Sequence, residues 1–538
     1  MNTQTAGKPL SQEQKVAAAR AAGLTWRDAV GFFAMVFGMF MAILDIQIVS
    51  SSLNEIRAGL SASPEEISWV QTSYLVAEVV MIPLSGILAR LLSTRVLFTL
   101  SALAFAAASA ACAMVTSLDA MIVARAIQGF VGGAMIPSVY AMSYMLYPPE
   151  RRAQMSVLMG LIATLAPTIG PTLGGYVTDW LSWHWLFLIN VVPGLCVAAC
   201  VWLFADFDKP EPEVAKGFDL PGLLLMALFL ASLDYVFEEG PRHDWLQDPT
   251  IRTLAVLGVI SGCLFFWRMF SYRLPIVDLT AFGNRNFAMG TMMNAVAGVG
   301  LYGVVYILPL FLGRVRGLDS RQIGDIMFVT GVFQFVSAPF LGMLARRVDV
   351  RLMMAGGFAL FALSMALLVP MTKDWGFWEL FLPQAIRGVS LMAILIAANF
   401  LAFGTLAPQQ LKNAAGLYNL LRNIGGALGL AMINTLLISR QTLHVSTLAT
   451  DVGSTSPLAG PMLEGLSERL GDMLTGDPDL AALQLLNQMV QREALVLSFS
   501  DVLLLIAGIF AAAILLVPFI SRPLPPPAVP AQAPADAH

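Results

Sequence analysis

The sequence predicts an all-α polytopic membrane protein with about fourteen transmembrane helices, from its composition and from the spacing of its apolar stretches. Hydrophobic residues make up 57% of the chain and charged residues only 12%, whereas soluble domains carry roughly 25% charged residues. About fourteen apolar stretches approach the roughly 20 helical residues that cross a bilayer core of about 30 Å. Because lipid offers no water to backbone amides and carbonyls, these stretches must be helical.

The apolar stretches follow one another along nearly the whole chain. The polar residues before them, 1–28, are predicted to be a cytoplasmic segment with a short interfacial helix from Ser11 to Ala22. This segment is not a secretory signal, since the apolar run after it is too long. We place the spans at 29–51, 67–89, 96–115, 119–146, 153–178, 184–205, 218–237, 251–271, 287–313, 322–344, 351–370, 376–404, 412–439 and 494–520. The Pro- and Ala-rich tail 523–538 is predicted to be disordered and cytoplasmic.

Basic residues orient these spans. With a cytoplasmic N-terminus, the inner loops carry more Lys and Arg than the outer loops, as the positive-inside rule requires. Arg314, Arg316 and Arg321 oppose this trend without reversing it. Both termini are therefore predicted to be cytoplasmic.

Two short strings recur in the second part of the chain. Their positions are 86–90 (GILAR) and 342–346 (GMLAR), and then 126–129 (AIQG) and 385–388 (AIRG). Similar offsets and topology predict two related six-helix halves, 29–206 and 273–522, with an inserted helix pair at 207–272. Parallel repeats of six helices are the organisation of the major facilitator fold, whose substrate site lies between the halves.

Of the carboxylates inside predicted spans, where an ionisable group costs roughly 2.5–3.5 kcal/mol, two are the strongest functional candidates. Asp45 follows Leu44 in the first span, and Glu78 lies nearer the middle of the second. Asp45 is either a group that handles protons or substrate, or an Asp capped by polar neighbours near the outer interface. Glu78 is either a second protonation site or counter-charge for a cationic substrate, or a structural partner for an Arg.

Three arginines lie inside spans and away from their ends. Arg125, flanked by small residues and followed by Gln128, needs a carboxylate or backbone acceptor, because a buried Arg does not deprotonate. Asp45 and Glu78 are the candidate partners. Arg387 and Arg422 either recognise an anionic group on a substrate or pair with a carboxylate in the bundle.

The fifth span contains a pair of prolines and a pair of glycines, each pair spaced four residues apart. Pro167 and Pro171 share one face, and so do Gly170 and Gly174, with Gly175 following. Glycines four apart permit close helix contact, and the prolines remove backbone donors and bend the helix. Packing alone accounts for the glycines, whereas prolines in the same register favour a gating role.

The sequence has no feature of an enzyme or of a metal or cofactor site. Its four histidines are scattered, its four cysteines lie in apolar segments, and no Ser/His/Asp cluster or metal-ligand spacing occurs. No ATP-binding loop is present either. We expect no catalytic residues, no metal and no cofactor, and a gradient as the energy source.

The fifth-span run resembles the antiporter signature of major facilitator drug exporters, and other motifs resemble the 14-helix drug:proton antiporter branch of EmrB-type proteins. Arg125, Gln128 and Gly129 match its fourth-helix pattern, in which the Arg is thought to assist proton transfer. The further matches, covering the chain from about Val30 to Ile520, are Leu44-Asp45 with Ile48-Val49, and 69–70, 72–74, 147–149, 183–185, 189–190, 275–279 and 285–287.

The chain departs from this family pattern in three places. The cytoplasmic loop motif of Gly86, Arg90 and Arg95 has Arg90 where the superfamily usually has Asp. The first-span signature continues with Ser50 instead of Asn. Glu78 is not a general family residue, which makes it a candidate for substrate preference.

The resemblance implies an inner-membrane exporter of amphiphilic small molecules or drugs in exchange for protons. Asp45 and Arg125 would couple the proton, and Glu78, Gln128, Arg387 and Arg422 would line the substrate cavity. It also implies a periplasmic membrane-fusion adaptor and an outer-membrane channel as partners. The periplasmic segment 441–493 would either contact the adaptor or cap the bundle. A proton-coupled importer of a small organic solute is the alternative.

Overall fold

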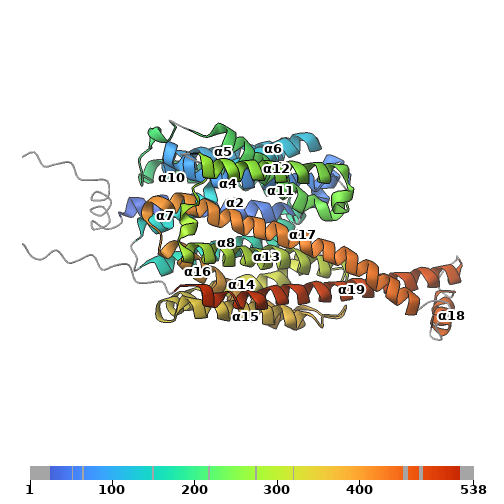
Figure 1. Ribbon diagram of the computed structural model, residues 1–538. Helices are drawn as coiled ribbons and strands as arrows, with labels where there is room; N and C mark the ends of the chain where they lie inside the picture. The colour runs from blue at the N-terminus through green and yellow to red at the C-terminus, as the bar shows by residue number, and fades with distance from the viewer. Residues whose placement is uncertain are drawn as a thin grey trace, which may run out of the picture.

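The computed structural model describes residues 25–50, 52–63, 66–147, 151–215, 218–272, 276–318, 320–451, 459–471 and 477–521, which form a bundle of long helices (Figure 1). Fourteen of these helices are long and apolar enough to cross a membrane. The predicted all-α polytopic fold class is therefore confirmed. The expected interfacial helix from Ser11 to Ala22 and the tail 523–538 lie outside the described residues.

The first six spans contain two interrupted helices. In the fourth span, a turn at Gly133 and Ala134 separates the two segments. The helices are α2 (Trp26–Ser50), the short α3 (Leu53–Leu60), α4 (Trp69–Leu92), α5 (Thr94–Met114), α6 (Leu118–Gly132) with α7 (Met135–Leu146), α8 (Arg152–Trp180), and α9 (His184–Leu188) with α10 (Val191–Phe204).

The next two spans form an antiparallel pair, and six more spans follow. The pair consists of α11 (Leu220–Glu239) and α12 (Pro249–Ser271). The later spans are α13 (Arg285–Arg314), α14 (Ser320–Arg347), α15 (Val350–Leu368), α16 (Phe377–Gly404), α17 (Leu411–Asp451) and α19 (Pro478–Ile514), with α18 (Ala459–Gly471) between the last two. Short 3₁₀ turns are η2 (Pro212–Ala215), η3 (Gly240–Arg242), η4 (Trp245–Gln247), η5 (Leu279–Gly283), η6 (Pro408–Gln410) and η7 (Val517–Phe519).

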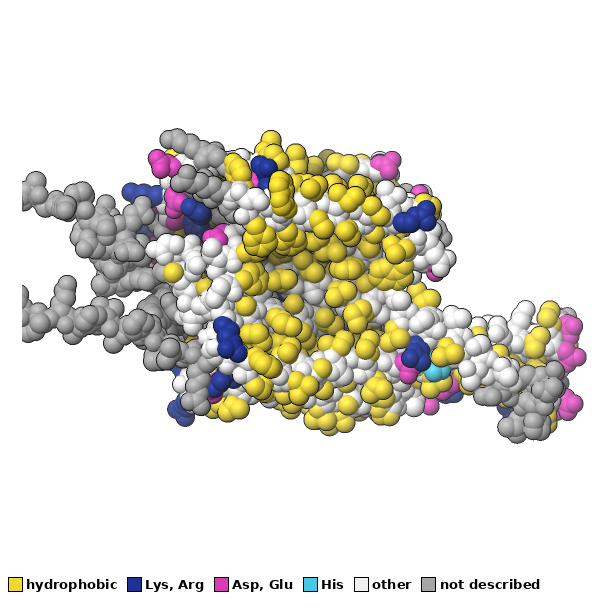
Figure 2. Space-filling model, viewed as in Figure 1, with side chains coloured by type: hydrophobic (Ala, Val, Ile, Leu, Met, Phe, Trp, Pro, Cys, Tyr) yellow, Lys and Arg dark blue, Asp and Glu magenta, His cyan; other side chains and the backbone are white. Residues whose placement is uncertain are grey.

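The surface of the bundle matches a bilayer. Hydrophobic side chains cover the middle of the face shown in Figure 2, and basic and acidic side chains gather at its two ends. Trp267, Phe270 and Phe340 are among the large apolar side chains that the bundle exposes. An apolar band between two charged rims is the surface that hydrocarbon and headgroup layers require. The chain is a multi-pass membrane protein.

Two helices project far beyond the bundle. The 41 residues of α17 span about 60 Å at about 1.5 Å per residue, twice the thickness of the hydrocarbon core. The segment α17–α19 leaves the bundle at one end, which we call the hairpin end (Figure 1). The predicted span 412–439 is thus the inner part of α17, and the predicted span 494–520 begins within α19 and runs past its end at Ile514. Much of segment 441–493 continues these two helices.

The helices before and after the inserted pair meet mainly where α8 packs against α14 and α16 and where α17 packs against α4 and α7. The inserted α11 packs against both α4 and α17. Thr72 of α4 donates to Glu239 of α11 at 3.2 Å, and Trp245 donates to Thr435 of α17 at 3.0 Å. The inserted pair therefore touches both sides of the bundle.

At the end opposite the hairpin, a lysine ties the beginning of α17 to the earlier helices. Lys412 Nζ lies 2.5 Å from Asp208 and also donates to the carbonyl of Ala89 at 3.2 Å. The Asp208 carboxylate also accepts from the backbone and hydroxyl of Thr94 at 2.9 and 2.7 Å. A charged group therefore links the two sets of helices near the cytoplasmic loop motif.

Candidate functional site

The polar centre of the first set of helices is an ion pair between α2 and α6. Arg125 Nη1 lies 2.5 Å from Asp45 Oδ2, and both side chains are fully buried. Asp45 lies in the last turns of α2, toward the hairpin end. Of the two partners that the sequence suggested for Arg125, the structure brings in Asp45.

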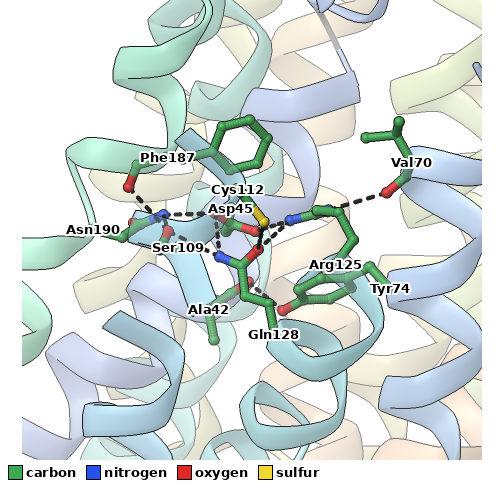
Figure 3. Close-up of polar contacts among 10 residues, drawn as sticks. All are labelled: Ala42, Asp45, Val70, Tyr74, Ser109, Cys112, Arg125, Gln128, Phe187 and Asn190. Carbon is green, nitrogen blue, oxygen red and sulfur yellow. Dashed lines mark hydrogen bonds and ion pairs between the residues drawn. The ribbon is translucent and has the colours of Figure 1, made fainter. Parts of the chain in front are cut away.

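Two amides complete the coordination of the Asp45 carboxylate (Figure 3). Asn190, between α9 and α10, donates to Asp45 Oδ1 at 2.6 Å, and Gln128 of α6 donates to the same oxygen at 3.1 Å. Ser109 of α5 accepts from both amides, at 3.2 and 3.0 Å. Asp45 is therefore held by three donors from two segments, with Arg125 and Gln128 on α6 and Asn190 between α9 and α10.

The guanidinium of Arg125 has further acceptors. It donates to the carbonyl of Val70 at 3.0 Å and to Gln128 Oε1 at 2.8 Å, and it lies 4.3 Å from the ring centre of Tyr74. Its Nη2 has no hydrogen-bond partner. The buried guanidinium thus belongs to α6 and contacts both α2 and α4.

The fifth-span motif lies on α8, directly beside this centre. Gly170 faces α2, where a Cβ would come within 3.2 Å of the backbone carbonyl carbon of Gln47. Gly174, Gly175 and Pro167 are buried as well, and Pro171 is half-buried. The absence of a side chain at Gly170 lets α8 approach α2 two residues from Asp45.

The opposite side of α8 contacts α14. Thr172 donates to the carbonyl of Gly324 at 3.1 Å, and Thr168 lies 3.5 Å from Gln334 Oε1. The α8 helix therefore lies between α2 on one side and α14, from the later set of helices, on the other.

A second buried arginine lies at an aromatic cluster that joins the two sets of helices. Arg422 of α17 donates to Tyr140 of α7 at 3.3 Å. The ring centre of Tyr418 lies 5.9 Å from that of Tyr140 and 4.9 Å from that of Phe403. Glu78 of α4, the helix that packs against α17, is buried as well.

The predicted cavity residues do not gather in one place. Gln128 belongs to the Asp45 centre, Glu78 and Arg422 lie on facing helices α4 and α17, and Arg387 lies between α14 and α16. Arg387 donates to Thr330 of α14 at 2.7 Å.

The cytoplasmic loop motif has its own contacts. Arg90 pairs with Glu211 at 3.1 Å, and the Arg95 guanidinium lies 5.0 Å from the ring centre of Trp202. A Cβ on Gly86 would lie 2.8 Å from the side chain of Asn413 on α17. A charged contact thus exists here with Arg90 in place of the usual Asp, its acid coming from the segment after α10.

Sequence reasoning missed several residues of these sites. Asn190 was noted only within a motif, and Ser109 was an ordinary serine in an apolar helix. Tyr140, Thr330 and Gln334 carried no signal either, because tyrosines and single polar residues in apolar spans are common. Among the described residues, no group of three or more His, Cys, Asp or Glu could hold a metal ion.

Comparison with known proteins identifies the family to which this chain is similar. The family model described as Major Facilitator Superfamily matches residues 35–430. The colistin resistance protein EmrB of Acinetobacter baumannii is 41% identical, covering 91% of this chain and 96% of the relative. The multidrug export protein EmrB of Escherichia coli K12 is 30% identical, covering 91% and 94%. The crystal structure of the human organic anion transporter MFSD10 has a TM-score of 0.56 at 13% identity, covering 90% and 99%, and shows the shared fold.

Proposed function

The chain belongs to the Major Facilitator Superfamily, as an EmrB-type transporter, and we propose that it exports amphiphilic small molecules across the bacterial inner membrane in exchange for protons. The observation that carries the proton part is the buried pair of Asp45 and Arg125. Buried ionisable groups in a membrane protein are costly and mark ion or proton pathways. The transport direction follows the export named for the relatives.

Protonation of Asp45 would change the contact between α2 and α6. A proton on Oδ2 takes the place of the Arg125 hydrogen that this oxygen now accepts at 2.5 Å. The neutral acid loses its attraction for the guanidinium, which retains Val70 and Gln128 as acceptors. Proton arrival therefore favours a different arrangement of these helices, and proton loss favours the present one.

The motif helix would carry this change to the other half. Because α8 touches α2 at Gly170 and α14 at Thr168 and Thr172, a shift of α2 alters the contact between halves. We propose that α2–α10 and α13–α19 move against each other in this way, with the prolines of α8 allowing the helix to bend.

The aromatic cluster between the halves is the proposed substrate site. Tyr140 and Tyr418 offer flat apolar faces with polar edges, which suit amphiphilic molecules. Glu78 supplies a buried acidic group and Arg422 a buried basic one. The site thus favours solutes with an aromatic or aliphatic body and a polar or charged group.

Everted membrane vesicles containing the protein test this function. Lipophilic cations, weak acids and neutral amphiphiles are added one at a time while a pH-sensitive dye reports protons in the lumen. An exchanger releases lumenal protons when a transported compound is added, and vesicles without the protein show no release. If no compound triggers release even with the adaptor present, the proposal is wrong. Proton-linked loss of preloaded compound would indicate symport.

We propose that the hairpin end lies in the periplasm, with both termini cytoplasmic, and that α17–α19 contacts a membrane-fusion adaptor linked to an outer-membrane channel. The extension reaches about 30 Å beyond the hydrocarbon core. Exposed Leu480 and Leu483 on α19 and Met462 on α18 offer apolar contacts at its tip. Capping of the bundle is less well supported, since the tip lies away from it (Figure 1).

Replacing residues 452–476 with a short Gly-Ser linker is expected to abolish crosslinking to the adaptor. The change removes α18 but retains the membrane-spanning parts of α17 and α19, so insertion and abundance should be unchanged. Crosslinking is measured in cells that express both proteins. Leu443→Ser, an exposed change on α17 nearer the bundle, serves as a control for altered surface polarity. Wild-type crosslinking by the linker variant would contradict the proposed contact.

A further inference from the structure

Arg387 is a buried cation that has no carboxylate as an ion-pair partner among the described residues. Its side chain is 1% exposed, its Nη2 donates to Thr330 at 2.7 Å, and its Nη1 has no partner. Among the ion pairs of the described residues, none includes Arg387. A buried charge with an unused donor is unfavourable unless an acceptor reaches it.

A second unused donor lies on the same side of α14. Gln334 follows Thr330 by one helical turn, so the two side chains share a face. It is fully buried, and its Nε2 has no partner. A Cβ on Gly388, next to Arg387, would lie 3.2 Å from the Gln334 backbone nitrogen. The backbone of α16 therefore lies directly against the part of α14 that carries these donors.

The two halves of the chain differ in where the buried arginine lies in the recurring string. In the recurring strings, Arg125 and Gln128 of α6 correspond to Gln384 and Arg387 of α16, so the Arg and the amide have exchanged places. The first pair surrounds Asp45. The first helix of the second half, α13, carries no Asp or Glu anywhere along its length. The second half thus has the donors of the first without its anion.

We propose that Arg387 and Gln334 form a binding site for a monovalent anionic group. Thr330 holds the guanidinium in place, since its hydroxyl accepts from Arg387 at 2.7 Å and donates to Gln384 at 2.9 Å. A carboxylate on an amphiphilic solute and a free chloride ion share the needed chemistry, since each accepts hydrogen bonds and carries one negative charge. Thr168 of α8 contacts Gln334 at 3.5 Å. A bound anion therefore lies at the contact between the halves, where it would strengthen one arrangement over the other. The site does not depend on proton exchange.

Binding is tested on the purified full-length protein in detergent, with a bulky sulfonate as the only buffer anion. Thermal unfolding is followed while chloride or decanoate is added at constant ionic strength, and decanol serves as the uncharged match for decanoate. A saturable rise in Tm with chloride identifies a free ion. A rise with decanoate beyond that with decanol identifies the carboxylate of an amphiphile. No rise with either anion overturns the proposal.

Variants locate the site. Arg387→Gln is expected to weaken anion binding about tenfold or more, because it removes the charged donor. Arg440→Gln, at an exposed arginine near the hairpin end, is the matched control and should bind as the wild type does. If Arg387→Gln retains the full response, the site is elsewhere and the proposal fails.

Gln334→Glu provides a test that does not rely on a loss. The substituted carboxylate is close in size to the amide and supplies an internal anion beside Arg387. We expect it to raise the Tm in anion-free buffer and to remove the response to added anion. A merely structural role for Gln334 predicts a lower Tm with the response retained, which would contradict the proposal. Both readouts are independent of transport, so they separate this inference from the proposed exchange function.

Discussion

Replacing Asp45 with Asn is expected to abolish substrate-driven proton release while the protein still inserts into the membrane. The amide cannot take up a proton, and it presents a neutral group to Arg125 at the 2.5 Å contact. Loss of one partner from a buried ion pair costs about 3–5 kcal/mol, so reduced stability is expected as well. Proton release in everted vesicles and the Tm of the purified protein measure the two effects.

A double variant separates coupling from folding. In Asp45→Asn with Arg125→Gln, both charges are removed and no unpaired cation remains, so stability should largely return whereas proton release should not. Asp501→Asn is the control for loss of an acid, because that carboxylate lies in a partly exposed pair with His444 at 2.9 Å. Substrate-driven proton release by the double variant would remove Asp45 from the mechanism.

Replacing Gly170 with Ala is expected to reduce transport severely while leaving the helices intact. The added methyl group would come within 3.2 Å of the Gln47 backbone carbonyl carbon and 3.3 Å of the Ile48 nitrogen. Backbone atoms cannot turn aside as a flexible side chain does, so α8 and α2 must separate. Initial rates of export in vesicles, normalised to the amount of inserted protein, measure the effect.

Gly356→Ala is the matched control for this change. Gly356 lies on α15, and a Cβ there meets no atom within 4 Å. Alanine is favoured over glycine in a helix by about 1 kcal/mol, so the control should be neutral or stabilised. Equal export rates in the two variants would show that close packing of α8 on α2 is not needed for transport.

The fold class was predictable because the bilayer restricts what an apolar sequence can form. Length and hydrophobicity alone identify spans, since backbone groups in lipid must be satisfied within each helix. The same reasoning underestimated the length of the helices at the hairpin end. Beyond the hydrocarbon core hydropathy falls, although α17 continues to Asp451 and α19 begins at Pro478. Helical continuity in water depends on packing between these helices, which hydropathy does not report.

The sequence by itself determined which residues are too costly to be incidental: Asp45, Glu78, Arg125, Arg387 and Arg422 stand out because charge in a span is rare. Only the tertiary structure decided their partners. Asp45 lies 80 residues from Arg125 and 145 from Asn190 along the chain, and Arg387 has no carboxylate, although its string resembles that of Arg125. Hydropathy records the cost of each charge one residue at a time. The partners that offset this cost lie on helices distant in sequence, and only the packing of those helices brings the partners into contact with the charged group.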